Sequence, residues 1–238
     1  MELNSIEIIN GIFGCIYVIV SIIVGLRLIF KYFKEKNTTY IYVGLTWIGF
    51  STPWLAASLS FLVFILTGKP LAPFLYFFIG VTFIPLFALI WMTAFAILLY
   101  EDNKKIIQII FAIYGILFEV FFLYFLFTDT TVIGVQRTPI DTDWGLFMTV
   151  YLFIVIVIGV ITGLVFAIKS MKAPNEEIKL RGKFILVAFI LWALGSALDA
   201  IIELPLIRTL AIAILIISAI LWYFAFNLPK FLKDKISS

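Results

Sequence analysis

Long runs of apolar residues, separated by short polar segments, dominate the chain from end to end. A transmembrane helix needs roughly 20 mostly apolar residues, because about 30 Å of hydrocarbon is crossed at about 1.5 Å per residue. The runs are continuous rather than alternating, which favours helices over barrel strands of about ten residues. We therefore predict an all-α bundle of seven transmembrane helices in a single domain covering residues 1–238, with helices at about 6–33, 40–67, 71–99, 106–127, 144–168, 184–202 and 206–226.

The composition identifies a bilayer as the solvent of this chain. The 238 residues are 64% hydrophobic and 13% charged, with a mean hydropathy of +1.18. A soluble domain carries about 25% charged residues, and a soluble monomer of this size cannot bury so much apolar surface. We predict an integral protein of the cell membrane that contacts membrane lipid.

The sequence lacks histidine and contains a single cysteine, Cys15. The missing histidine excludes histidine-based catalysis and histidine-ligated haem or zinc, and a single cysteine excludes an intramolecular disulfide. Neither a phosphate-binding Walker motif nor a dinucleotide-binding glycine fingerprint occurs in the sequence. We therefore expect neither an enzyme nor a protein that holds a cofactor or a metal ion.

Basic residues fall unevenly on the two sides of the predicted topology. All 17 lysines and arginines lie on one side except Lys69, Arg137 and Arg208. Because cytoplasmic loops carry an excess of basic residues, we predict that the N-terminus is outside and the C-terminus inside. We expect the basic inner loops to contact anionic lipid or a cytoplasmic signalling partner, and we expect no nucleic-acid binding.

Two carboxylates, Glu119 and Asp199, fall well inside the predicted helices, in the outer half of the bundle. An ionisable residue at membrane depth costs about 2.5–3.5 kcal/mol on insertion scales, so each is a functional candidate. Two interpretations stay open for both residues: a protonated, hydrogen-bonded structural carboxyl, or a binding group for a proton, a cation or a ligand amine. Glu203 and Arg208, at the outer interface, are predicted to pair with each other or to meet water.

Tryptophan and serine side chains recur at helical spacing on the face that carries Asp199 and on one face of the second predicted helix. They are Trp192, Ser196, Trp47, Ser51 and Trp54. Helix packing with local hydroxyl bonding is the commoner cause of such a stripe. The alternative is a ligand pocket that these five residues line together with Glu119 and Asp199. Pro53 interrupts the second predicted helix and Pro85 the third, and each proline frees a backbone carbonyl at membrane depth that must find an internal partner.

For two further segments, the sequence leaves two structural interpretations open. Gly159 and Gly163 form a small-residue motif that allows close approach of another helix, either within the bundle or between protomers of a homo-oligomer. The intramolecular contact is the favoured one. The outer segment 128–143 forms either a short hairpin arm over a pocket mouth or a loose linker.

From about Phe74 to its end, the chain resembles the seven-helix N-terminal sensor domain of prokaryotic membrane histidine kinases. The resemblance is carried by Phe83-Ile84-Pro85-Leu86-Phe87, Asp143-Trp144-Gly145 and Lys179-Leu180-Arg181-Gly182-Lys183. Sensor domains of that kind precede an output domain, whereas this sequence ends soon after Phe226. The resemblance therefore implies a stand-alone sensor module that signals through a partner.

Together, these patterns favour a receptor-type or sensor-type protein that binds a small apolar or amphipathic ligand, or a lipid, in the outer half of the bundle. The alternative is a small secondary transporter or ion-conducting protein with Glu119 and Asp199 as coupling carboxylates. The first three and last three helices show no self-similarity, which weighs against a transporter built from repeats. A structural or assembly subunit that packs through Gly159 and Gly163 is the third interpretation.

Overall fold

The computed structural model of the chain describes residues 3–201 and 204–229. Its contacts divide the chain into two compact units, Met1–Val155 and Ile156–Ser238. The division falls within one continuous helix, α7 (Leu146–Met171). A single-domain organisation therefore stays a prediction.

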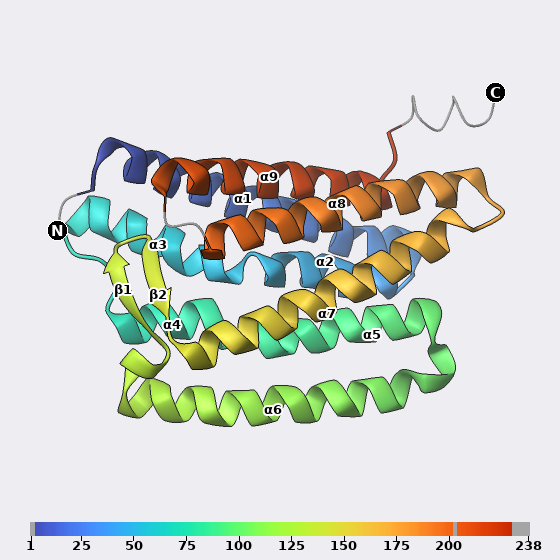
Figure 1. Ribbon diagram of the computed structural model, residues 1–238. Helices are drawn as coiled ribbons and strands as arrows, with labels where there is room; N and C mark the ends of the chain where they lie inside the picture. Colours follow the sequence, from blue (N-terminus) through green and yellow to red (C-terminus); the bar gives the residue numbers. More distant parts are fainter. Residues whose placement is uncertain (1–2, 202–203, 230–238) are drawn as a thin grey trace. The chain divides into compact units, whose positions relative to one another are not determined.

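The first unit is built mainly from helices, with a small hairpin between the last two of them (Figure 1). Its elements are α1 (Ser5–Glu35), α2 (Thr39–Phe50), α3 (Thr52–Thr67), α4 (Pro73–Val81), α5 (Ile84–Leu99), the 3-10 turn η1 (Glu101–Asn103), α6 (Lys104–Thr128), the 3-10 turn η2 (Thr130–Val132), β1 (Gly134–Thr138), β2 (Asp141–Trp144) and the start of α7. The strands pair antiparallel, with Gly134 opposite Trp144. Of the two alternatives for the outer segment, the structure therefore has the hairpin.

Two of the predicted spans are interrupted where the prolines indicated. The helices α2 and α3 meet at an angle of 50°, just before Pro53, whose missing N–H leaves the Gly49 carbonyl without its helical donor. The Thr52 hydroxyl donates to that carbonyl at 2.8 Å, so the freed group is satisfied internally. The second interruption separates α4 from α5 at residues 82–83, just before Pro85.

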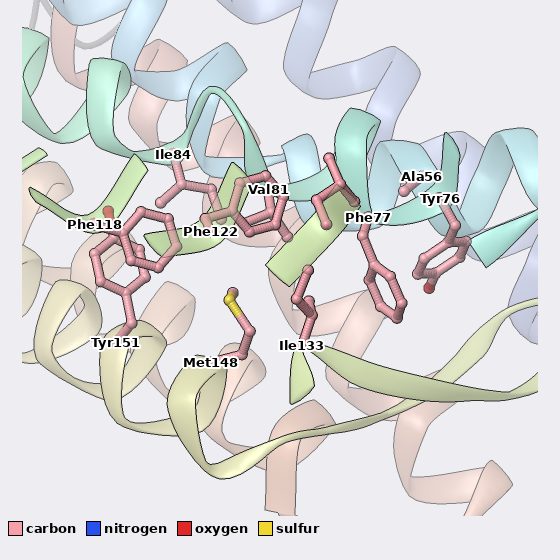
Figure 2. Close-up of a cluster of buried hydrophobic side chains, with 11 residues drawn as sticks. Ala56, Tyr76, Phe77, Val81, Ile84, Phe118, Phe122, Ile133, Met148 and Tyr151 are labelled. Carbon is pink, nitrogen blue, oxygen red and sulfur yellow. The ribbon is translucent and has the colours of Figure 1, made fainter. Parts of the chain in front are cut away.

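Helices α4, α6 and α7 enclose the aromatic core of the first unit, together with the loop after η2 (Figure 2). Phe77, Phe122 and Met148 are fully buried there, and Ile133 from the outer segment is buried among them. Outside this cluster, the Gln136 side chain of β1 donates to the Ser60 hydroxyl of α3 at 3.1 Å. The hairpin is therefore anchored by one apolar and one polar contact.

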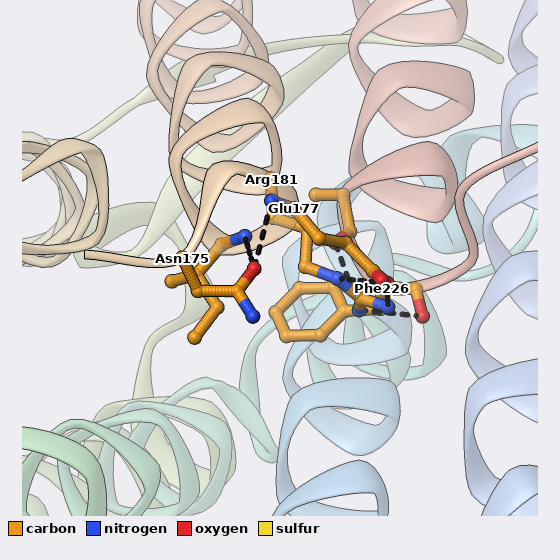
Figure 3. A network of polar contacts seen from close by, with 6 residues as sticks. Asn175, Glu177, Arg181 and Phe226 are labelled. Carbon is orange, nitrogen blue, oxygen red and sulfur yellow. Dashed lines mark hydrogen bonds and ion pairs between the residues drawn. The ribbon is translucent and has the colours of Figure 1, made fainter. Parts of the chain in front are cut away.

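The second unit contains the rest of α7 together with α8 (Glu176–Ile201) and α9 (Pro205–Phe226). Phe189 and Trp222 are fully buried between α8 and α9, with ring centroids 5.3 Å apart. Near the start of α8, Arg181 donates to Glu177 at 2.6 Å and to the Phe226 carbonyl at 3.1 Å (Figure 3). This guanidinium ties the start of α8 to the last turn of α9, where the carbonyls have no helical donor.

The helices agree with the predicted spans except at the start of α8. That helix begins at Glu176 rather than at Phe184, so part of the predicted inner loop is helical. The Asn175 side chain accepts from the backbone N–H groups of Glu177 and Ile178 at 2.8 and 3.2 Å, which caps the helix at this earlier point. The acidic pair at its first turn also suits the positive end of the helix dipole.

The length and composition of the helices indicate an all-α membrane protein. Within the described residues, six helices are long and apolar enough to cross a membrane, and the bent pair α2–α3 brings the number to seven if it counts as one span. The all-α class is thereby confirmed, with six or seven helices that are long and apolar enough to span a membrane.

Candidate functional site

One face of α6 that carries polar and small residues lies against α5. Gln108 donates to the Thr93 hydroxyl at 3.3 Å, and a Cβ on Gly115 would lie 3.1 Å from the Cβ of Pro85. These contacts fix an antiparallel register between the two helices. One helical turn further out, the same register brings Glu119 to the level of Thr82, where α4 and α5 are interrupted.

Glu119 lies deep in the span that α6 forms. It is roughly 14 Å along the helix axis from Thr128 and roughly 22 Å from Lys104. The side chain is half-buried, and its Oε2 is a buried atom with no hydrogen-bond partner among the described residues. A buried acceptor without a partner costs about 1–3 kcal/mol, and more when it carries charge, so this position calls for an explanation.

Two buried tyrosines lie in the same part of the first unit. Tyr151 of α7 is near enough to Glu119 to feel its charge, and Tyr114 lies five residues before Glu119 on α6. The two tyrosine rings stack with centroids 5.7 Å apart. Both hydroxyls are buried and have no hydrogen-bond partner within residues 3–201 and 204–229. We call Tyr114, Glu119 and Tyr151 the carboxylate–phenol cluster.

Aromatic packing holds this cluster in place. Phe118, one residue before Glu119, stacks on the Tyr151 ring with centroids 3.4 Å apart and planes 13° apart (Figure 2). Phe118 also stacks on Phe147 in the first turn of α7. The two rings are therefore held in place by the core.

The tyrosines of this cluster were not among the residues predicted from the sequence. A signal for them was present, because tyrosine in membrane helices normally lies at the interface, where its hydroxyl meets water. Tyr114 is roughly 15 Å along α6 from the start of this helix at Lys104, which is deeper than an interfacial belt. Tyr151 gives no such signal, because its pairing with Tyr114 depends on how α6 and α7 pack.

The residues predicted on the second span lie in helix contacts of the first unit. Trp47 is fully buried and packs on Phe50 with ring centroids 6.1 Å apart. Trp54 meets Tyr17 of α1 edge-on at 5.3 Å, and the Ser51 hydroxyl donates to the Ile48 carbonyl at 2.8 Å. These contacts are helix packing with local hydroxyl bonding, which was the commoner of the two predicted causes of the tryptophan–serine stripe.

The residues predicted on the sixth span lie in the second unit. Asp199 accepts a hydrogen bond from Arg208 at 3.0 Å, and the predicted pairing of Arg208 with Glu203 involves a residue outside the described part of the chain. Trp192 and Ser196 are buried, and the Ser196 hydroxyl has no partner in the described part of the chain. A pocket shared by Glu119 and Asp199 would join the two units and stays a prediction.

The small-residue motif of α7 is filled by aromatic rings of α8. A Cβ on Gly163 would lie 2.5 Å from the Phe189 ring, and one on Gly159 would lie 3.5 Å from the Trp192 ring. The favoured intramolecular contact is thereby confirmed. An oligomer that used the same two glycines would have to displace both rings.

A cavity of about 410 Å³ opens at the end of the first unit that carries the hairpin, between the hairpin and the segment that joins α3 to α4. It is lined by Pro70, Leu71, Ala72, Pro73, Thr130, Thr131, Gly134, Val135 and Gln136. The lining carries neither an acid nor a base. The described residues also contain no group of three or more Cys, Asp and Glu side chains that could hold a metal ion.

Comparison with other proteins identifies no relative of this chain. No known protein family, curated protein or solved structure matches it. The resemblance to histidine kinase sensor domains therefore stays a prediction. The function has to be argued from the geometry of the carboxylate–phenol cluster, because a helical bundle alone does not define an activity.

Proposed function

We propose that the protein is a receptor-type or sensor-type membrane protein that binds an amphipathic molecule, or a lipid, through the carboxylate–phenol cluster. One observation carries the proposal: three oxygen atoms, on Tyr114, Glu119 and Tyr151, are buried without a hydrogen-bond partner among the described residues. Buried polar groups in native proteins are nearly always paired. A bound molecule that supplies the missing donors accounts for all three atoms at once.

The ligand would reach the cluster from the bilayer. Ile116 and Val120, which flank Glu119 on α6, are 63% and 61% exposed. The two side chains present an apolar surface next to the carboxylate, and in a membrane that surface meets lipid tails. An amphipathic molecule can therefore lay its apolar part along α6 and direct its polar end to Glu119, without a closed cavity.

The proposed topology has seven spans, with the bent pair α2–α3 as one of them and the N-terminus outside. The distribution of lysine and arginine along the sequence supports it, since only Lys69, Arg137 and Arg208 fall on the outer side. Glu119 then lies in the outer half of its span. The basic inner loops would contact anionic lipid or a signalling partner.

Native mass spectrometry of protein extracted from its own membrane tests the proposal. The wild-type protein should carry a bound amphiphile that Glu119→Gln loses at least about tenfold, a factor that corresponds to about 1.4 kcal/mol. Glu101→Gln is the matched control, because Glu101 is an exposed acid at the inner end of α5 and its loss changes the net charge equally. Equal occupancy in all three proteins would contradict the proposal.

A transporter is the second candidate, because the interruption between α4 and α5 lies at the level of Glu119. Interrupted helices at membrane depth are typical of ion and substrate sites in transporters. The ion pair of Asp199 with Arg208 speaks against Asp199 as a second coupling carboxylate. Proton or sodium flux into proteoliposomes that is abolished by Glu119→Gln would favour this candidate over a receptor.

A further inference from the structure

We infer that the polar end of the ligand is a cation, and that the ligand belongs to the class of long-chain amines. The inference rests on the proposed function, because it concerns the same cluster of Tyr114, Glu119 and Tyr151. It adds the chemical class of the molecule, which the position of the site alone does not give. Two features carry it: the charge at the site and the lipid-facing surface.

The charge at the site calls for a cation. The buried Oε2 of Glu119 has no partner in the described part of the chain, and the bases at the inner end of its helix, Lys104 and Lys105, lie roughly 20 Å away along the axis. Asp199, by contrast, has a counter-charge within the protein, because Arg208 Nε lies 3.0 Å from its Oδ1. An ionised carboxylate at membrane depth needs such a counter-charge, and at Glu119 a ligand would supply it.

The carboxylate decides the sign of the ligand's charge. A carboxylate ligand would meet a like charge at Glu119, which is unfavourable at short distance. An alcohol would leave the charge of Glu119 uncompensated. An ammonium group brings a positive charge together with N–H donors for the carboxylate.

The lipid-facing surface favours an amphiphile over an inorganic cation. The described residues beside Glu119 on its exposed side are apolar, with Ile116 and Val120 more than half exposed. A small hydrated ion would give up its water there with few polar atoms to replace it. A long-chain amine keeps its apolar part in the lipid while the ammonium group reaches the carboxylate, as amphipathic side chains do at membrane interfaces.

Thermal unfolding of the full chain in detergent tests the inference with three probes of equal chain length: dodecylamine, dodecanol and dodecanoate. We expect dodecylamine to raise the Tm of the wild-type protein by about 5 °C at saturating concentration, with dodecanol and dodecanoate below about 1 °C. Glu119→Gln should lose the dodecylamine shift, and the control Glu101→Gln should keep it. Tyr151→Phe, which retains the stacked ring, should reduce the shift and provides the test if Glu119→Gln fails to fold.

The outcomes separate this inference from the proposed function. An equal Glu119-dependent shift with dodecanol or dodecanoate overturns the amine class and leaves an amphiphile site in place. An equal shift with ammonium chloride at the same concentration overturns the amphiphile class. A dodecylamine shift that survives both Glu119→Gln and Tyr151→Phe overturns the site itself and contradicts the proposed function as well.

Discussion

Asp199 Oδ1 accepts a hydrogen bond from Nε of Arg208 at 3.0 Å, which joins the last turn of α8 to the first turn of α9. The two side chains are 19% and 20% exposed. A pair that is so little exposed is screened less than a surface ion pair and contributes more to stability. Asp199 therefore has a protein partner for its charge, whereas Oε2 of Glu119 has none among the described residues. This difference is why the site is assigned to Glu119.

Breaking the Asp199–Arg208 pair is predicted to cost stability in a coupled way. Asp199→Asn and Arg208→Gln should each lower the free energy of unfolding by about 2 kcal/mol, because each leaves a partly buried charge without its partner. The double variant should lose about 1 kcal/mol less than the sum of the single losses. Chemical denaturation in detergent measures all three, and strictly additive losses would show that the pair makes no net contribution.

The two glycines of α7 are predicted to respond differently to alanine. Gly163→Ala places a Cβ 2.5 Å from the Phe189 ring and should cost about 1–3 kcal/mol, since the ring has to shift within a packed contact. Gly159→Ala meets the Trp192 ring at 3.5 Å, an ordinary contact, and should change stability by less than about 0.5 kcal/mol. Thermal unfolding compares them directly. A change of oligomeric state in both variants, without this difference in stability, would point to an interface between protomers instead.

The hairpin is predicted to depend on Ser60. The buried Ser60 hydroxyl accepts from the Leu71 backbone N–H at 3.2 Å and from the Gln136 side chain at 3.1 Å. Ser60→Ala leaves both donors without that partner and should cost about 2 kcal/mol, while Gln136→Ala should cost about 1 kcal/mol. Trypsin cleavage after Arg137 should accelerate in the same order, with cleavage after Lys172 in the turn between α7 and α8 as the internal standard. Identical rates in all proteins would refute the anchoring role.

Arg181 is predicted to protect the last turn of α9. Its guanidinium donates to Glu177 and to the Phe226 carbonyl in one planar arrangement, which a lysine ammonium cannot reproduce. Arg181→Lys should therefore accelerate amide hydrogen exchange at Asn227, which donates to the Tyr223 carbonyl, about fivefold or more. Lys179→Arg, in an exposed pair with Glu176, is the control and should leave this exchange unchanged.

Much of the fold could be predicted because the bilayer imposes simple rules on sequence. Apolar runs of membrane length predicted the helices, and Pro53 and Pro85 predicted the two interruptions, since proline removes a helical donor whatever surrounds it. The predicted start of α8 was wrong by about two helical turns. Charged residues from Glu176 to Lys183 look like loop in a search for apolar runs, yet Asn175 caps a helix there.

The candidate site was predictable only in part. Glu119 was found because a carboxylate in an apolar helix is conspicuous in any arrangement. Its neighbour Tyr151 was not, because α6 and α7 are separated by the hairpin segment, and which side chains meet depends on the packing of Phe118 and Phe147. The hydrogen bond between Asp199 and Arg208 was not predicted either, because it depends on how α8 and α9 pack.

The measurement that tests the central claim most directly is an experimental density map of the protein purified in its native lipid. The account predicts density for a bound molecule with its polar end about 3 Å from Glu119 Oε2 and its apolar part along Ile116 and Val120. A map in which Glu119 Oε2 is hydrogen-bonded to another group of the protein, with no bound molecule beside it, would contradict the account.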